Sequence, residues 1–219
     1  EIKKFFDKKI NKKFVVDKNS LDWQRKIQIQ FSTFECKKRI QMNWKKIFGK
    51  IKCPKIISSN HHFNHAFQAY HNSGFKKSLC LTIDGFGDKE CTTIWKCDNK
   101  KIVPIKKIEA PNSLGWFYSA FTEFFGFSAY DGEYKLMGLA SYGQKNIKLR
   151  KKILKVLYYN EAENTYNLNP YFIHYGSHSW SARFTDKLID LIGIPPLNKT
   201  NKYKRIYYDL AFEVQYALE

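Results

Sequence analysis

Apolar and polar residues alternate with a period of two between residues 78 and 109, which is typical of β-strands with two different faces. The alternating segments are residues 78–84, 91–96 and 102–108. Turns that contain glycine, asparagine or aspartate separate them, so the pattern predicts an antiparallel meander of three strands. In the first strand Leu79, Leu81 and Ile83 share one face, and Asp84 ends the strand on the other, more polar face.

A helical period of apolar residues predicts helices before and after the meander. One or two helices are expected within residues 20–51, after a short strand at 13–16. A further strand at 55–59 is expected to lead into a helix over 61–72, which Asn60 caps and Gly74 ends. The later helices are expected at residues 114–125, 133–141, 147–159, 180–192 and 203–219. The predicted fold class is therefore mixed α/β, with a strand meander followed by helices.

Composition indicates a globular, soluble chain. Its 219 residues are 43% hydrophobic, which is enough for a substantial core. No run of about 18 apolar residues and no charged-then-apolar leader occurs, so we expect a cytoplasmic location and no membrane partner. The sequence begins at Glu1 and its last helical pattern still continues at Glu219, which favours a fragment of a longer protein. The five cysteines contain no C-x-x-C pair, which favours reduced thiols over disulfides or a zinc knuckle.

The net charge of +18 raises the question of nucleic-acid binding. Five of the 38 basic residues are arginines, namely Arg25, Arg39, Arg150, Arg183 and Arg205. Base and phosphate recognition usually draws on the bidentate fork of arginine. The composition therefore favours a solvated surface rich in lysine, and nucleic acid is not an expected partner.

Three residue types suited to metal binding converge near the start of the meander. His61 and His65 lie four positions apart, so a helix places both imidazoles on one face. Asp84 ends the next strand, and two imidazoles with one carboxylate suit Fe(II), Mn(II) or Zn(II) with open coordination positions. His62 falls off this face. It is expected either to support the metal ligands without binding the ion or to lie at the surface.

The turn after Asp84 is rich in glycine. Gly85 and Gly87 would let backbone N–H groups approach a phosphate without a side chain in the way. The sequence thus predicts a metal and a phosphate in one pocket.

Six motifs carry a resemblance to a known family. They are His61-His62-Phe63-Asn64-His65-Ala66, Ser73-Gly74-Phe75, Thr82-Ile83-Asp84-Gly85-Phe86-Gly87-Asp88, Pro111-Asn112-Ser113-Leu114-Gly115, Phe125-Gly126-Phe127 and Gly132-Glu133-Tyr134-Lys135-Leu136-Met137-Gly138-Leu139-Ala140-Ser141-Tyr142-Gly143. In order and spacing, over about residues 54–144, they resemble the amino-terminal domain of the O-carbamoyltransferases. That family includes nodulation-factor, cephamycin and aminoglycoside carbamoylating enzymes.

The resemblance implies part of an actin-like ATPase (ribonuclease-H-like) fold. Residues 1–76 would end its first subdomain and residues 77–219 would begin its second. Earlier strands, a later aspartate ligand and the carboxy-terminal domain that makes the adenylate would lie outside this chain. The fragment alone is therefore not expected to catalyse the whole reaction.

The resemblance also assigns roles to residues. It implies that His61, His65 and Asp84 hold an iron-like metal, most simply Fe(II). It implies that the Asp84–Gly85–Gly87 turn and the segment Ser113, Leu114 and Gly115 approach ATP or carbamoyl adenylate. Asp84, Glu133 and Lys135 are the candidate catalytic or polar pocket residues. For Glu133 and Lys135 an exposed pair at i,i+2, whose members do not face each other, is an equally open interpretation.

By resemblance the parent enzyme uses ATP and carbamoyl phosphate to make carbamoyl adenylate, and then carbamoylates a hydroxyl of a sugar or natural-product acceptor. Two alternatives stay open. A threonylcarbamoyl-transferring tRNA-modification protein shares the fold and the metal pair, although residues 133–143 look like the small-molecule branch. A lysine-rich nucleic-acid-binding module without catalysis leaves the arrangement of His61, His65 and Asp84 unexplained. Steep salt dependence of RNA binding would support either alternative.

Overall fold

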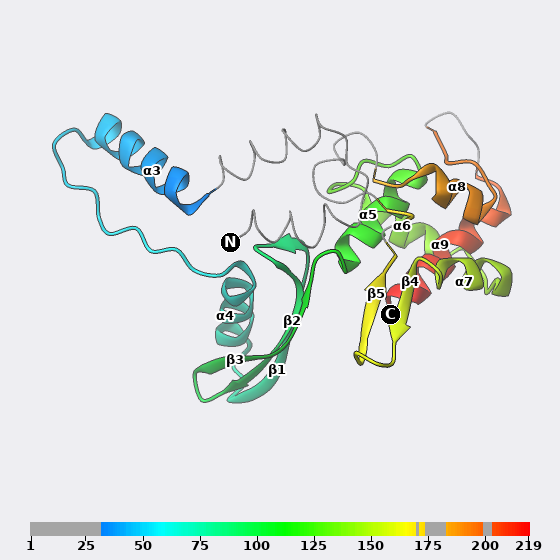
Figure 1. Ribbon diagram of the computed structural model, residues 1–219, viewed down its shortest axis with the longest axis horizontal. Coiled ribbons are helices and arrows are strands. Elements are labelled where there is room, and N and C mark those ends of the chain that lie inside the picture. Colours follow the sequence, from blue (N-terminus) through cyan, green and yellow to red (C-terminus); the bar gives the residue numbers. More distant parts are fainter. Residues whose placement is uncertain (1–31, 170, 174–182, 199–202) are drawn as a thin grey trace.

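A computed structural model describes residues 32–169, 171–173, 183–198 and 203–219. The strand expected at residues 13–16 and the beginning of the helical region expected within residues 20–51 lie outside the described residues. The later part of that region is α3 (Thr33–Phe48), which begins at the N-cap Ser32 and buries none of its residues. Figure 1 shows α3 standing apart from the strands and the later helices.

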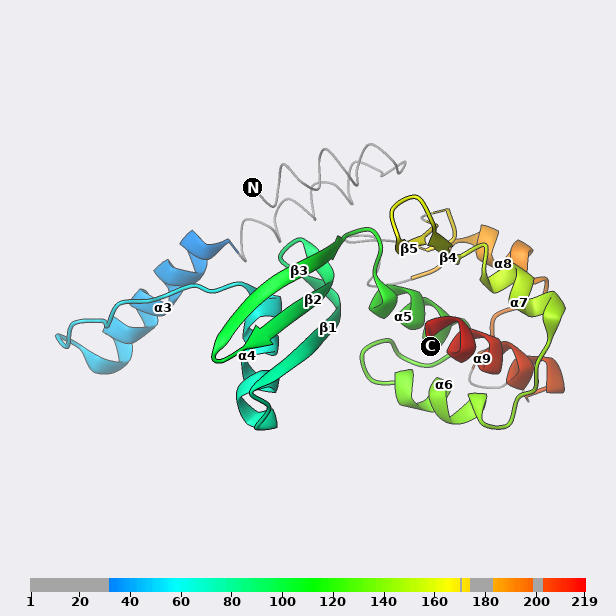
Figure 2. The same ribbon diagram turned by 90° about the horizontal axis from the view of Figure 1, so that it is seen from below.

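The predicted meander is confirmed as a three-stranded antiparallel sheet. Its order is β1 (Lys77–Gly87), β2 (Glu90–Asp98) and β3 (Lys101–Glu109), with β2 in the middle. The helix α4 (His61–Ser73) packs against β1 and β2 (Figure 2). It is capped by Asn60 and ends at Gly74, which adopts the left-handed conformation that favours glycine, so both predicted ends are confirmed.

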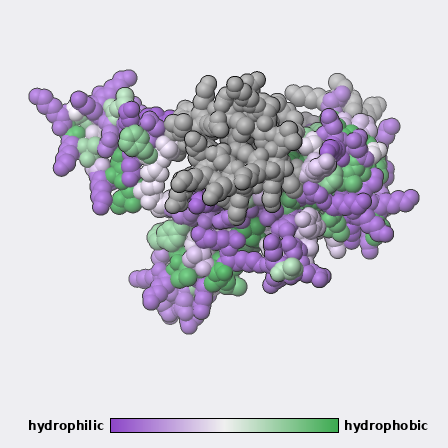
Figure 3. All heavy atoms as spheres, viewed as in Figure 1, coloured by the Kyte–Doolittle hydropathy of each residue, from purple (hydrophilic) through white to green (hydrophobic). Residues whose placement is uncertain are grey.

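The helix α4 covers the more polar face of β1. Thr82 is 6% exposed, and Ala66 and Tyr70 of α4 pack against Trp95 and Cys97 of β2. The opposite face of β1 carries Leu79, Leu81 and Ile83, which are 71%, 58% and 50% exposed. Hydropathy alone therefore does not identify the covered face of this strand. In Figure 3 apolar residues also reach the surface around α4 and on α3.

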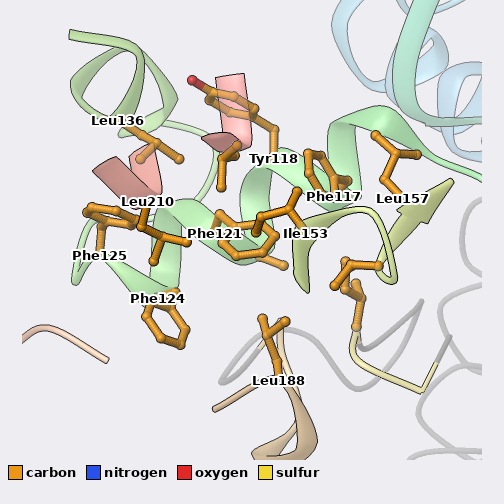
Figure 4. Close-up of a cluster of buried hydrophobic side chains, with 14 of the residues drawn as sticks. Phe117, Tyr118, Phe121, Phe124, Phe125, Leu136, Ile153, Leu157, Leu188 and Leu210 are labelled. Carbon is orange, nitrogen blue, oxygen red and sulfur yellow. The ribbon is translucent and has the colours of Figure 1, made fainter. Parts of the chain in front are cut away.

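The later helices surround α5 (Leu114–Phe124), most of whose residues are buried. The other elements of this unit are α6 (Glu133–Ala140), α7 (Ile147–Ile153), β4 (Leu157–Asn160), β5 (Thr165–Leu168), α8 (Asp186–Ile192) and α9 (Arg205–Leu218). Figure 4 shows Phe117, Phe121 and Phe124 of α5 packing among side chains of the other elements. A helix that is apolar on nearly all sides is stable only at the centre of a core, and α5 lies there.

Three predicted elements need correction. Residues 55–59 form no strand, because no other described strand pairs with them, and Ile57 is 79% exposed. The helix predicted over 147–159 ends at Ile153, and residues 157–160 instead form β4, paired with β5. In the segment 180–192 the helix α8 begins only at Asp186, while residues 180–182 lie outside the described part.

No helix in the described part of the chain is long and apolar enough to cross a membrane.

Candidate metal centre

The centre begins at the first turn of α4. Asn60 accepts a hydrogen bond on its side-chain oxygen from the backbone N–H of Phe63 (2.9 Å), which fixes where the helix starts. His61 is the first helical residue and His65 follows one turn later, so their imidazoles share a face. The two rings lie edge to face with centroids 4.6 Å apart.

The structure brings both imidazoles to the carboxylate of Asp84. His61 Nε2 lies 2.6 Å from Asp84 Oδ2 and 3.1 Å from His65 Nε2, and His65 Nε2 lies 3.7 Å from the same Asp84 oxygen. Metal–ligand bonds of about 2.0–2.2 Å separate neighbouring donors by about 3.0–3.5 Å. The three observed separations bracket that range, and the donor atoms lie within 4.8 Å of one another. Two imidazole nitrogens and one carboxylate oxygen therefore fit a divalent ion in both chemistry and spacing.

Asp84 is held in its charged form. Burial acts to raise the pKa of its carboxyl group, but hydrogen bonds from His61 and from the backbone N–H of Gly85 (2.6 Å), with nearby histidine charge, outweigh it and lower the pKa below its usual value. The Asp84 side chain is 36% exposed, while those of His61 and His65 are 43% and 55% exposed. The three candidate donor groups are thus held by contacts with the protein and remain partly exposed to solvent.

His62 is buried, not a surface group. It is 0% exposed, its Nδ1 lies 2.9 Å from Thr82 Oγ1, and its Nε2 lies 3.0 Å from the carbonyl oxygen of Glu90. Burial lowers the pKa of His62 below its usual value. His62 therefore ties α4 to the sheet while the adjacent His61 faces Asp84, and nothing in its sequence spacing had indicated this role.

The glycines near the centre have packing reasons of their own. A Cβ on Gly87 would lie 2.3 Å from His61 Cδ2, and a Cβ on Gly115 would lie 2.8 Å from the backbone of Gly85. Ser113 caps α5 and donates its hydroxyl hydrogen to the carbonyl oxygen of Gly85 (2.6 Å). The N-terminus of α5 is thereby held against the end of β1, which continues irregularly to Gly87 where the sequence had predicted a turn directly after Asp84. Leu114, the first residue of α5, is 9% exposed.

Glu133 and Lys135 lie elsewhere. Both are on α6, which Figures 1 and 2 place among the later helices, away from α4. The Glu133 carboxylate accepts hydrogen bonds from Ser119 Oγ (2.9 Å) and from the backbone N–H of Tyr130 (2.8 Å). Burial opposes ionisation of Glu133, but its hydrogen bonds outweigh burial and lower its pKa. Lys135 Nζ lies 5.6 Å from the ring centroid of Tyr134. Neither Glu133 nor Lys135 belongs to the imidazole–carboxylate cluster, which consists of His61, His65 and Asp84.

Sequence comparison identifies the family. A sequence model described as "Carbamoyltransferase N-terminus" matches residues 2–219. The chain belongs to this carbamoyltransferase family. The resemblance found in the motifs is therefore confirmed over almost the whole chain.

Three relatives illustrate how this carbamoyltransferase N-terminal domain is distributed. An uncharacterized protein of Synechocystis is 34% identical over 166 residues, which cover 76% of this chain and 26% of the relative. The nodulation protein NolNO of Sinorhizobium fredii is 39% identical over 97 residues, covering 44% of this chain and 14% of the relative. The nodulation protein NolO of Bradyrhizobium diazoefficiens is 40% identical over 84 residues, covering 38% and 15%. The matched region thus spans about a quarter or less of these relatives.

Proposed function

We propose that this chain is the metal-holding part of an ATP-dependent O-carbamoyltransferase. The whole protein would convert carbamoyl phosphate and ATP into carbamoyl adenylate and transfer the carbamoyl group to a hydroxyl of a sugar or natural-product acceptor. The observation that carries the proposal is the convergence of His61, His65 and Asp84 in a chain of the carbamoyltransferase family. Two relatives are nodulation proteins, and the family that the motifs resemble includes nodulation-factor carbamoylating enzymes.

In this proposal His61, His65 and Asp84 hold one divalent ion, Fe(II) by preference and Mn(II) or Zn(II) by the same donor chemistry. A bound ion would supply Lewis-acid polarisation of a carbonyl or phosphoryl oxygen. The protein contributes the fixed position of the ligands, because Asp84 is oriented by the N–H of Gly85 and by the His61 ring. The half-exposed side of the cluster leaves room for the substrate.

The nucleotide or adenylate would lie between two backbone segments. One is the irregular end of β1 with Gly85 and Gly87, and the other is the start of α5 at Ser113, Leu114 and Gly115, where a helix N-terminus favours an anion. The contact between Ser113 and Gly85 joins these segments, so both can face one phosphate group. Glu133 and Lys135 stay candidate contacts of a more distant part of the substrate.

The same proposal places the protein in the cytoplasm with carbamoyl phosphate, ATP and a hydroxylated acceptor as small-molecule partners. Residues 1–76 and 77–219 would be the end of the first and the start of the second actin-like subdomain.

Asp84→Ala in the protein tests the proposal. Loss of a direct ligand should lower the amount of bound metal about tenfold or more and abolish carbamoyl transfer. Even the mutation of a residue that only hydrogen-bonds to a metal ligand typically lowers metal affinity by about tenfold or more. Metal content by mass spectrometry is the direct measurement. Asp98→Ala is the matched control, because Asp98 ends β2 at the opposite turn, where it pairs with Lys77 (3.4 Å). Unchanged metal content in Asp84→Ala would make this aspartate structural and refute the proposed centre.

A further inference from the structure

The turn between β1 and β2 contacts the start of α4. Asp88 Oδ2 accepts a hydrogen bond from the backbone N–H of His61 (3.0 Å) and another from the side-chain amide of Asn60 (3.2 Å). These contacts join residues 27 and 28 positions apart in the chain. Asp88 therefore satisfies one of the first N–H groups of the helix, while Asn60 satisfies another.

His61 is consequently held at both ends by one short segment. Asp84 contacts its ring at Nε2 (2.6 Å), and Asp88 contacts its backbone N–H. Between these aspartates, Gly87 lies so close to the His61 ring that even a methyl group would collide with it. The pairing of β1 with β2 is irregular between Ile83 and Gly87. The strand therefore departs from regular pairing in the same segment that contacts His61.

The backbone of Asp88 suits this task. Its φ angle is 57°, in the left-handed region that aspartate, asparagine and glycine adopt most readily. This conformation turns the chain so that the carboxylate reaches back to α4. The capping of α4 does not need Asp88, because Asn60 already forms the N-cap hydrogen bond. The additional contact falls on the residue whose imidazole faces Asp84.

We infer that Asp88 is a positioning residue of the metal centre: by fixing the backbone of His61, it keeps the His61 imidazole facing Asp84, so that both can reach one ion. This inference rests on the proposed metal-binding function. Partners that orient metal ligands in this way affect metal affinity without touching the ion.

Asp88→Gly tests the inference in the full protein, because glycine accepts the left-handed conformation and removes only the carboxylate. Affinity for Co(II) and Fe(II), measured by competition with a chelator, should fall about 10- to 100-fold. The visible absorption spectrum of the Co(II) form should change as well. Asp88→Asn should restore affinity to within about threefold of the wild-type value, because its amide oxygen can still accept the hydrogen bond from His61.

Asn99→Gly is the matched control. Asn99 has a φ angle of 46° in the turn at the other end of the sheet, so the same type of change is made away from α4. It should leave metal affinity and the Co(II) spectrum unchanged. Wild-type affinity in Asp88→Gly, equal loss in Asn99→Gly, or no rescue by Asp88→Asn would each overturn the inference alone. A wild-type protein that binds no ion would overturn the proposed function together with it.

Discussion

At the scale of single residues, the centre depends on close contacts that exclude even one methyl group. Gly87 and His61 are in such contact, since a Cβ at position 87 would come within 2.3 Å of the ring. The imidazole cannot move away without leaving Asp84 Oδ2, which lies 2.6 Å from its Nε2. The small size of Gly87 is therefore required by the position of the His61 imidazole, the proposed metal ligand, in addition to any role in approaching phosphate.

Gly87→Ala should displace His61 and weaken metal binding about tenfold or more. It should also destabilise the protein by about 1–3 kcal/mol, because the added methyl group has no space. Gly138→Ala on α6 is the control, since nothing lies within 4 Å of the added carbon and alanine favours a helix by roughly 0.5–1 kcal/mol. Metal titration and urea unfolding measure both effects. Wild-type metal affinity in Gly87→Ala would show that the His61 ring can move freely.

The sequence was sufficient to predict that His61, His65 and Asp84 would meet. The two histidines lie on consecutive turns of one helix, and Asp84 follows the regularly paired part of the next strand, so local geometry places them near one another. The strand itself continues to Gly87, beyond the predicted end at Asp84. The role of Asp88 was not predictable in this way. Its contact with His61 depends on how α4 packs across the sheet and on an irregular strand ending, neither of which follows from a periodic pattern.

At the scale of elements, prediction succeeded where a segment stabilises itself or pairs with its sequence neighbour. The meander has short turns and regular alternation, and its three strands were predicted to within a few residues. The error at residues 147–159 has a physical cause. Ile153, Val156 and Leu157 keep helical spacing and are all buried, yet Leu157 pairs with Leu168 in a hairpin. Periodicity alone cannot choose between these two ways of burying the same side chains.

An ion pair between β2 and β3, buried on the glutamate side, yields a pH-dependent prediction. The Glu90 side chain is 9% exposed and its Oε1 lies 2.7 Å from Lys107 Nζ. Burial opposes ionisation of Glu90, but the Lys107 contact and backbone hydrogen bonds outweigh burial and lower its pKa. Because the folded-state pKa is lowered, this carboxylate stabilises the fold above the ordinary glutamate pKa of about 4.3, and that contribution is lost as the pH falls through the folded-state value.

Lys107→Met should reduce the free energy of unfolding by about 1–2 kcal/mol at pH 7. A fully buried pair would cost more, but the Lys107 side chain is 45% exposed and solvent screens the pair. The difference from wild type should shrink as the pH falls through the lowered folded-state pKa of Glu90, because Glu90 then becomes protonated in both proteins. Urea unfolding from about pH 3 to about pH 7 measures this difference in the free energy of unfolding. Lys101→Met on the same strand is the control. A difference that does not depend on pH would exclude Glu90 as its cause.

At the scale of the whole molecule, the described chain leaves apolar surface uncovered on both α3 and the sheet. None of the residues of α3 is buried, and one face of the sheet exposes Leu79, Leu81 and Ile83 of β1 together with Val103 and Ile105 of β3. The matched region spans about a quarter or less of the relatives' length. Among the described residues the more apolar face of β1 is therefore left uncovered, and α4 packs on its more polar face.

Two adjacent residues of β1 test which face is covered. Leu81 is 58% exposed, so Leu81→Lys should change the free energy of unfolding of this chain by about 0.5 kcal/mol or less. Thr82→Val keeps the shape of its buried side chain but removes the hydroxyl that contacts His62 Nδ1 (2.9 Å) and accepts from Trp95 Nε1 (3.0 Å). Leaving these buried nitrogens without a partner should cost about 1–3 kcal/mol. Hydropathy alone ranks the two substitutions in the opposite order, because it assigns Leu81 to the core. Urea unfolding of both variants decides between the two orders, and a larger loss in Leu81→Lys would mean that α4 does not cover the face that carries Thr82.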